Sequence, residues 1–179
     1  MADKKGLSPL MLLPPLIFAA LAVLFYFGVV REDPSALPST LIGRAAPGLQ
    51  LERIGDLPLL TDEMVTAPGV KLVNFWGTWC VACRQEHPQL VKMATEMGIT
   101  LYGVNYDDTP ARALQYLARE GNPFTAVGED VSGRNKIDWG VYGAPETFVI
   151  DANGNVVLRH AGPITEDVLT STILPAMKR

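Results

Sequence analysis

The sequence has little cysteine, little histidine and no run of basic residues. It holds two cysteines and two histidines in 179 residues, and its formal net charge is −4. Without a basic face the chain lacks the electrostatic footprint that nucleic acids require, so we expect no nucleic-acid partner. A closed metal site needs four ligands, so we also expect no resident metal and no cofactor. Repeats and low-complexity tracts are absent, and the ~145 residues beyond the N-terminal segment match one ordinary domain.

The two cysteines, Cys80 and Cys83, are separated by two residues and follow directly on the apolar run 71–76. A pair at this spacing, where a strand gives way to a helix, is typical of a redox dithiol. Haem attachment needs a histidine directly after the second cysteine, and Arg84 stands there instead. A purely structural disulfide would stabilise little, because the loop it closes is short. Half of a zinc site stays open as an alternative; the pattern favours a redox pair forming a Cys80–Cys83 disulfide.

An uncharged N-terminal stretch predicts the compartment. No residue from Gly6 to Val30 is charged, and residues 10–30 are mostly apolar, which matches the ~20 residues that a helix needs to cross a bilayer. Lys4 and Lys5 favour an N-terminus inside the cell. A cleaved signal peptide is the alternative. We therefore expect a cytoplasmic N-terminus at 1–9, a transmembrane anchor at 10–30, a linker at 31–42 and a domain on the oxidising side at 43–179.

The remaining pattern predicts strands and helices in alternation. Apolar runs predict strands at 48–54, 57–60, 70–76, 99–104, 124–127, 146–150 and 156–160, and helical spacing or caps predict helices at 80–97, 109–121, 132–139 and 165–174. Asn153-Gly154 indicates a two-residue hairpin turn, and Pro175 should end or kink the last helix near Leu174. Alternation followed by a hairpin and a helix predicts an α/β domain with a central mixed sheet flanked by helices.

The predicted helix start explains how the cysteine pair would react. Cys80 falls at the N-terminus of the helix, where unpaired backbone N–H groups and the helix dipole favour an anion. A thiolate is the nucleophile in disulfide exchange, so this position lowers the thiol pKa and activates the sulfur. Cys83, one turn further along, is expected to be less exposed and to resolve the mixed disulfide.

Three segments carry a resemblance to a known family. Residues 75–83 resemble the thioredoxin active-site segment, and Pro88 matches the helix-kinking proline of that superfamily. Residues 83–88 and 140–148 are similar to the membrane-anchored thioredoxin-like proteins of cytochrome c maturation, the DsbE or CcmG family. The resemblance implies a thioredoxin-like fold and a single-pass protein of the bacterial inner membrane. It implies a periplasmic reductase that takes electrons from a membrane thiol transporter and keeps apocytochrome c cysteines, or those of a maturation partner, reduced.

The resemblance also nominates site residues around the dithiol. Asn74 stands where thioredoxin has a buried aspartate, so Glu86 is nominated as the proton handler; its alternative is a solvated surface carboxylate. Trp79 is expected to flank the nucleophile. Ala144-Pro145 is expected to form a cis bond beside Cys80 and to offer backbone groups to a substrate strand. Glu146 is expected to recognise a basic or polar peptide, with a strand-edge charge as its alternative.

Two other functions stay open at this point. One is a thioredoxin-like reductase for another periplasmic client, such as the copper-site cysteine pair of an oxidase. The other is a membrane-tethered copper carrier that would use Cys80, Cys83 and His160. Because no extra apolar surface is evident in the sequence of the domain, we expect a monomer.

Overall fold

The computed structural model describes residues 9–29 and 39–178, and in the first of these stretches the side chains of residues 13–26. The chain divides into two units, 1–38 and 39–179. The described part of the first unit is helix α1, Pro9–Val29. Among the described residues, no helix is both long and apolar enough to cross a membrane. The membrane anchor stays a prediction, while Lys4, Lys5 and most of the expected linker lie outside the described residues.

The second unit is built on a five-stranded mixed sheet in the order β3-β2-β1-β4-β5. The strands are β1 Lys71–Trp76, β2 Leu101–Tyr106, β3 Ala126–Asp130, β4 Glu146–Ile150 and β5 Val156–Ala161. The first three pair in parallel, and β4 pairs antiparallel with both β1 and β5. Strand β1, at the centre, is buried along its whole length, as its continuous apolar run predicts. The predicted α/β domain with a mixed sheet is confirmed.

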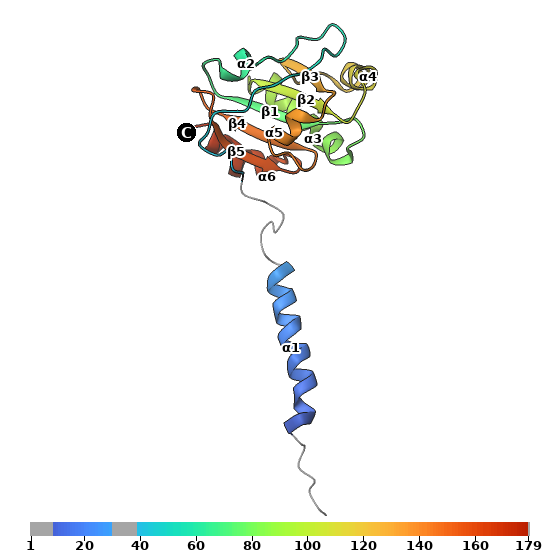
Figure 1. Ribbon diagram of the computed structural model, residues 1–179, viewed down its shortest axis with the longest axis vertical. Helices are drawn as coiled ribbons and strands as arrows, with labels where there is room; N and C mark the ends of the chain where they lie inside the picture. The colour runs from blue at the N-terminus through green and yellow to red at the C-terminus, as the bar shows by residue number, and fades with distance from the viewer. Residues whose placement is uncertain (1–8, 30–38, 179) are drawn as a thin grey trace, which may run out of the picture. The chain divides into compact units, whose positions relative to one another are not determined.

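Helices cover both faces of this sheet (Figure 1). Their bounds are α2 Asp62–Thr66, α3 Val81–Thr95, α4 Pro110–Glu120, α5 Arg134–Asp138 and a C-terminal helical segment of α6 Glu166–Val168, η1 Leu169–Ile173 and α7 Leu174–Ala176. Helix α3 links β1 to β2, and α4 links β2 to β3. Because right-handed crossovers between successive parallel strands fall on one side of a sheet, both helices lie on the same face.

Each face of the sheet has its own core. On the first face, Leu90 of α3, Leu117 of α4 and Ile173 of η1 share a buried cluster with both cysteines. On the second face, Phe75, Trp139 and Phe148 pack together, with ring centroids 5.0 to 5.7 Å apart. Aromatic contacts of this kind add about 0.5–1.5 kcal/mol per pair beyond the area they bury. The redox pair thus lies on the face covered by α3 and α4.

The two expected N-terminal strands, 48–54 and 57–60, are wrong. This segment meets β3 at single points and forms no ladder among the described residues: an isolated bridge joins Glu52 to Glu129. Further along, the Val127 N–H donates to the Pro58 carbonyl at 2.9 Å and the Leu60 N–H to the Val127 carbonyl at 3.4 Å. Next to the bridge, the Asn135 side chain accepts from the Gln50 N–H at 2.8 Å and donates to the Gln50 carbonyl at 2.9 Å. At Gln50 an amide side chain therefore takes the place of a strand partner, which the periodicity of the sequence does not reveal.

The β4–β5 connection and the end of the last helix differ in detail from expectation. The β4–β5 hairpin forms, but its connection spans residues 151–155, because the Asp151 carboxylate accepts from the N–H groups of Asn153 and Asn155, both at 2.8 Å. The last helix ends at Ala176, one residue after Pro175 and two after the expected Leu174, and the π-helical turn η1 precedes this end. A π-helical turn is one of the known ways in which a helix absorbs an irregularity.

Candidate active site

Cys80 is the N-cap residue of α3, and it forms a disulfide with Cys83, with Cα atoms 5.3 Å apart. The Cys83 N–H points at the Cys80 sulfur, with N and Sγ 3.0 Å apart. An N-cap side chain normally accepts from the N2 or N3 amide, and here a sulfur takes that role. After reduction, the same amide and the dipole of the 15-residue helix would stabilise a Cys80 thiolate. The predicted position of Cys80 at the helix start is confirmed.

The exposure of the two cysteines differs from expectation. Cys80 is 4 % exposed and Cys83 is 6 % exposed, so Cys83 is not the more buried residue of the oxidised pair. The two sulfurs therefore differ in position and not in exposure: Cys80 caps the N-terminus of α3, and Cys83 lies inside its first turn. Around them, the side chains of Trp79, Val81 and Tyr142 are about half exposed or more. These apolar groups form a rim that a partner protein can cover.

A carboxylate from the β2–α4 connection holds the turn that leads into Cys80. Asp108 accepts from the Thr78 N–H at 2.6 Å and from the Thr78 hydroxyl at 2.8 Å. It also accepts from the Thr109 N–H at 2.9 Å and from Asn105 Nδ2 at 3.2 Å. Burial alone would raise the pKa of Asp108, but these hydrogen bonds outweigh it and lower the pKa below its ordinary value. The residue was not anticipated from the sequence.

Asp108→Ala should destabilise the domain by about 2 kcal/mol, because it leaves the partly buried Thr78 amide without its acceptor. Disulfide exchange by Cys80 should slow as well, since the turn before the nucleophile loses its anchor. Urea unfolding and the reaction rate of the reduced protein with a neutral disulfide measure the two effects. Thr78→Val is the matched control: it removes the hydroxyl contact but keeps the amide contact, and should show less than half of either change.

Trp79 lies against the same connection. Its indole Nε1 donates to the Tyr106 carbonyl at 3.1 Å, and its ring meets the Tyr106 ring edge-on at 5.7 Å. Trp79 is nevertheless 49 % exposed. It therefore flanks Cys80 with one edge fixed and one face open, consistent with a contact surface for a substrate.

On the other side of the dithiol lies the loop before β4. The Ala144–Pro145 bond is cis, as the resemblance implies, and the Ala144 carbonyl oxygen lies 3.3 Å from the Cys80 sulfur. The order β2-β1-β4 places this loop and the Asp108 connection on opposite sides of β1, whose end at Trp76 leads through a short turn to Cys80. Cys80 is thus set between two loops that are held independently.

Glu146 is buried beside the loop that precedes β4. Its side chain is 1 % exposed; it accepts from the N–H groups of Tyr142 and Gly143 at 2.9 and 3.1 Å and pairs with Arg159 Nε at 2.6 Å. The Arg159 guanidinium in turn lies over the Tyr142 ring, 4.4 Å from its centroid. Glu146 therefore shapes the loop beside Cys80, and its carboxylate is occupied by groups of this chain. This burial disagrees with the expectation that Glu146 recognises a peptide directly. It also disagrees with the alternative of a strand-edge charge, since β4 lies between β1 and β5.

Arg159→Lys should destabilise the domain by about 1–2 kcal/mol although the charge is kept. Lysine lacks the planar guanidinium that both donates to Glu146 and stacks on Tyr142. Chemical unfolding checks the size of the effect. Arg53→Lys, at an exposed arginine, serves as the control and should change stability by less than about 0.5 kcal/mol; an equal effect of both changes would contradict the role given to Arg159.

Glu86 is buried in α3, one turn after Cys83, and is 1 % exposed. Its carboxylate accepts from Asn74 Nδ2 at 3.0 Å and from the Ile164 N–H at 2.9 Å. Burial raises the pKa of Glu86 to about 7, and the two hydrogen bonds only partly oppose this rise. The alternative of a solvated surface carboxylate is wrong. Asn74, at the place of the missing aspartate, instead orients Glu86 and also donates to the Thr147 hydroxyl at 3.0 Å.

The histidines lie apart from one another in the fold. His87 is buried between α3 and α4, where Nε2 lies 2.9 Å from the Gly121 carbonyl, and burial lowers its pKa. His160 lies on β5, opposite Thr147. Among the described residues, no three side chains of histidine, cysteine, aspartate or glutamate are grouped to hold a metal ion.

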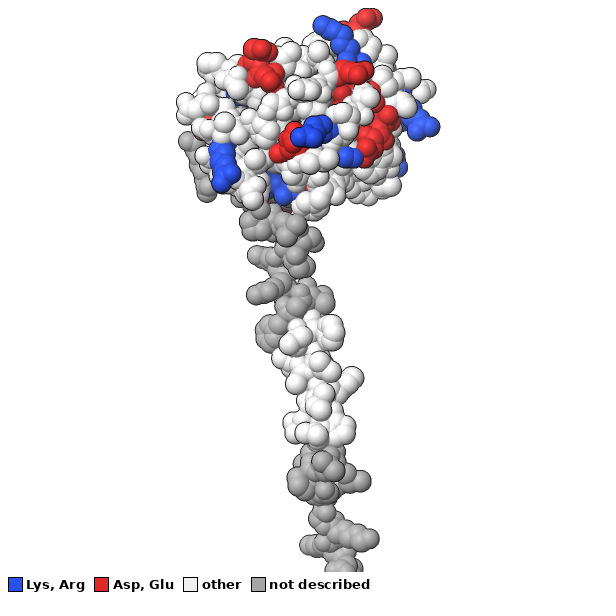
Figure 2. All heavy atoms as spheres, viewed as in Figure 1, with Lys and Arg blue, Asp and Glu red and all other residues white. Residues whose placement is uncertain are grey.

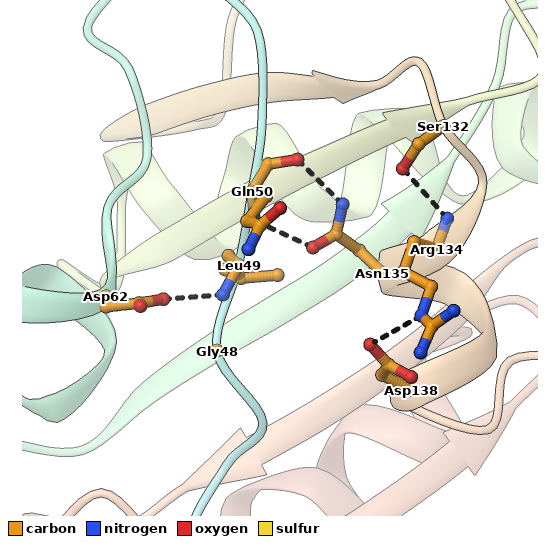
Figure 3. A pocket seen from close by; sticks show the side chains of 8 residues that line it. All are labelled: Gly48, Leu49, Gln50, Asp62, Ser132, Arg134, Asn135 and Asp138. Atoms are coloured by element: carbon orange, nitrogen blue, oxygen red, sulfur yellow. Dashed lines mark hydrogen bonds and ion pairs between the residues drawn. The ribbon is translucent and has the colours of Figure 1, made fainter.

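A separate hollow of about 670 Å³ is lined by Asn135 and by Leu49 of the second core (Figure 3). Its polar groups bind one another. Asp62 accepts from the Leu49 N–H at 2.5 Å, and Arg134 pairs with Asp138 at 3.5 Å. The hollow contains neither cysteine and is not part of the redox site.

Comparisons with known proteins agree with this geometry. The Redoxin family model matches residues 43–173. A DsbE homologue described as a thiol:disulfide interchange protein, from Paracoccus denitrificans, is 46 % identical over 172 residues, covering 96 % of this chain and 95 % of that protein. The thiol:disulfide interchange protein HelX of Rhodobacter capsulatus is 44 % identical over 170 residues, with 95 % and 96 % covered.

A solved structure shares the fold. The thiol:disulfide interchange protein of the thioredoxin family from Chlorobium tepidum has a TM-score of 0.61 and 25 % identity, covering 80 % of this chain and 99 % of that one. The thioredoxin-like fold is therefore confirmed, and the Cys80–Cys83 pair makes the protein a thiol–disulfide oxidoreductase. The chain belongs to the Redoxin family and, within it, to the DsbE group of thiol:disulfide interchange proteins.

Proposed function

We propose that this protein is a periplasmic reductase that keeps the haem-binding cysteines of apocytochrome c, or the thiols of a maturation partner, reduced. A membrane thiol transporter would supply its electrons, and the protein would act as a monomer. The support is the likeness of residues 83–88 and 140–148 to the cytochrome c maturation proteins, together with the relatives named above. The one observation that carries the chemistry is Cys80 at the N-cap of α3, with the Cys83 amide directed at its sulfur.

The reaction begins at Cys80 of the reduced protein. Its thiolate attacks one sulfur of the client disulfide, so the client S–S bond breaks as a Cys80–client disulfide forms. The electron pair of the broken bond leaves with the second client sulfur, which takes up a proton. The backbone of Ala144, whose carbonyl oxygen lies 3.3 Å from the Cys80 sulfur, would pair with the client strand during this step. Pro145 has no N–H, and its carbonyl already accepts from the Gly162 N–H at 2.8 Å.

Cys83 completes the exchange. Its thiolate attacks the Cys80 sulfur and breaks the bond to the client sulfur that Cys80 attacked. That sulfur leaves with the electron pair and takes up a proton, and the Cys80–Cys83 disulfide seen in the structure remains. Cys83 must first lose its proton in a buried place, and a carboxylate with a pKa near neutrality is suited to accept it. We assign this step to Glu86, one turn away on the same helix with a pKa raised to about 7. The net change is the transfer of two electrons and two protons to the client.

A reconstitution tests the choice of client. The reduced protein is mixed with apocytochrome c whose two haem-binding cysteines form a disulfide, and separately with a disulfide-bonded oxidase copper-site domain. We expect the apocytochrome to be reduced at least tenfold faster. A higher rate with the copper-site domain would make that domain the client in place of apocytochrome c, and the exchange chemistry would stand. Tight stoichiometric copper binding by the reduced protein, without disulfide exchange, would favour the carrier instead.

We propose further that the N-terminal segment tethers the domain to the inner membrane, with the domain in the periplasm. Residues 6–30 carry no charge, and the side chains of α1 from 13 to 26 are exposed and mostly apolar on all sides. Fractionation of cells and protease treatment of spheroplasts check this. The full chain should stay with the membrane in high salt and lose its domain to external protease; release into the soluble fraction would contradict the tether.

A further inference from the structure

A groove with an excess of arginine runs between α3 and α4 beside the redox site. It consists of two neighbouring hollows of about 360 and 180 Å³ that share Arg84 and Tyr116 as lining residues. The larger hollow is further lined by His87, Pro88, Val91 and Glu120, and the smaller by Thr78, Arg112, Gln115 and Arg119. We call these two hollows together the arginine groove.

The charge of the arginine groove is opposite to that of the chain. Three arginines but one acidic residue, Glu120, line it, whereas the whole chain carries −4. Figure 2 shows charges of both signs interspersed on the face of the domain that it draws. Guanidinium groups gathered around one hollow repel each other, and an anion placed between them relieves that repulsion and accepts charge-assisted hydrogen bonds.

The three arginines are not equally engaged. Arg84 donates to the Thr78 carbonyl at 2.7 Å, and Arg119 pairs with Glu120 at 2.6 Å. In the part of the chain that the structure describes, the Arg112 guanidinium has neither a hydrogen bond nor an ion pair. Arg112 is thus the cation of this groove that is open to an incoming carboxylate.

The larger hollow is suited to an apolar side chain. Pro88 and Val91 of α3 face Tyr116 of α4 across it. His87 contributes a ring packed edge-on against Tyr116 at 4.9 Å, and its Nε2 is already bonded to the Gly121 carbonyl. The groove therefore offers a mostly apolar pocket next to a cationic one, a pairing that matches an apolar residue followed by an acidic one.

The groove is close to the nucleophile. Thr78 precedes Cys80 by two residues, and the Arg84 N–H donates to the Cys80 carbonyl at 3.3 Å. It lies on the α4 side of β1, opposite the loop of Ala144 and Pro145. A polypeptide seated in the groove can therefore present a cysteine to Cys80 without occupying the cis-proline loop.

We propose that the arginine groove docks an acidic segment of the partner proteins that exchange disulfides with Cys80. An apolar side chain of that segment enters the larger hollow, and a neighbouring carboxylate lies between Arg84, Arg112 and Arg119. This inference depends on the thiol–disulfide exchange and not on which protein is the client.

Two synthetic peptides test it. Each carries one cysteine as a mixed disulfide with a neutral thiol, followed after a short spacer by Leu-Glu-Glu in one peptide and Leu-Lys-Lys in its twin. The reduced full-length protein should react with the acidic peptide about tenfold faster than with its twin at low salt. Salt at 0.5 M should reduce this preference to about threefold or less, because exposed charges are screened. Equal rates, or a preference for the lysine twin, would overturn the proposal.

Charge reversal locates the effect. In Arg112→Glu/Arg119→Glu the preference for the acidic peptide should vanish or reverse. The control Arg44→Glu/Arg53→Glu changes the net charge equally at exposed arginines outside the groove, and should keep most of the preference. If both double variants lose it alike, net charge and not the groove is responsible, and the proposal is wrong. Neither peptide comes from a cytochrome, so a wrong client assignment would leave these results unchanged.

Discussion

In the Cys83→Ala protein we expect a stable disulfide between Cys80 and its client, and turnover at least about 1000-fold below that of the unchanged protein. Resolution within the native protein is intramolecular, since the two Cα atoms are 5.3 Å apart. Without Cys83 the mixed disulfide must wait for a thiol from solution, at far lower effective concentration. Non-reducing electrophoresis and mass spectrometry of the linked species measure the outcome.

The reciprocal variant decides the order of the two sulfurs. Cys80→Ala should form almost no mixed disulfide, because Cys83 lies inside the first turn of α3 and not at its cap. A linked species that accumulates with Cys80→Ala and not with Cys83→Ala would reverse the roles. Reading the pKa of the Cys80 thiol in the Cys83→Ala protein adds a second check: a value no lower than the ~8.5 of free cysteine would remove the physical basis for the assignment.

Glu86 should make the stability of the oxidised protein fall as the pH rises from about 4.5 to 7. Its pKa is raised from 4.5 to about 7 in the folded state, so the folded protein keeps a proton that the unfolded chain releases in this window. The stabilisation is complete below pH 4.5 and lost above pH 7. A shift of this size corresponds to roughly 3 kcal/mol. Glu86→Gln does not titrate, so this dependence should disappear.

The measurement is a difference between two proteins. Urea unfolding of both proteins at pH 4 and at pH 8 gives the free energy of unfolding of Glu86→Gln minus that of the unchanged protein. This difference should rise by roughly 3 kcal/mol from pH 4 to pH 8. His87 titrates in both, so its contribution cancels. Glu96→Gln, at the exposed C-cap of the same helix, should show almost no such change. A difference that stays constant with pH would mean that Glu86 is already ionised in the fold.

The same carboxylate connects stability to turnover. If Glu86 accepts the Cys83 proton, Glu86→Gln should slow resolution of the mixed disulfide while the first attack by Cys80 keeps its rate. Single-turnover kinetics separate these two steps. Equal slowing of both steps would show that Glu86 acts by supporting the structure alone.

Local patterns predicted the parts of the fold that depend on neighbouring residues. Thr109 and Thr165 cap helices through hydrogen bonds to amides three residues ahead, and Cys80 caps α3 in the same way. The central strands fall within one or two residues of the apolar runs that predict them. By contrast, residues 48–54 and 57–60 have strand-like composition but bond to β3 only at Glu52, Pro58 and Leu60, and composition does not report how far a pairing extends.

The chemistry of this protein, a dithiol primed at a helix start, was already readable in the order of its residues, because caps and thiol spacing act over a few positions. The surroundings of that dithiol were not. Glu86 meets Ile164 across 78 positions, Asp108 meets Thr78 across 30, and Arg159 meets Glu146 across the hairpin. Burial and hydrogen bonding between remote segments arise only when the sheet assembles. For this reason the sequence does not reveal that Glu86 is a buried acid or that Glu146 supports the loop beside Cys80.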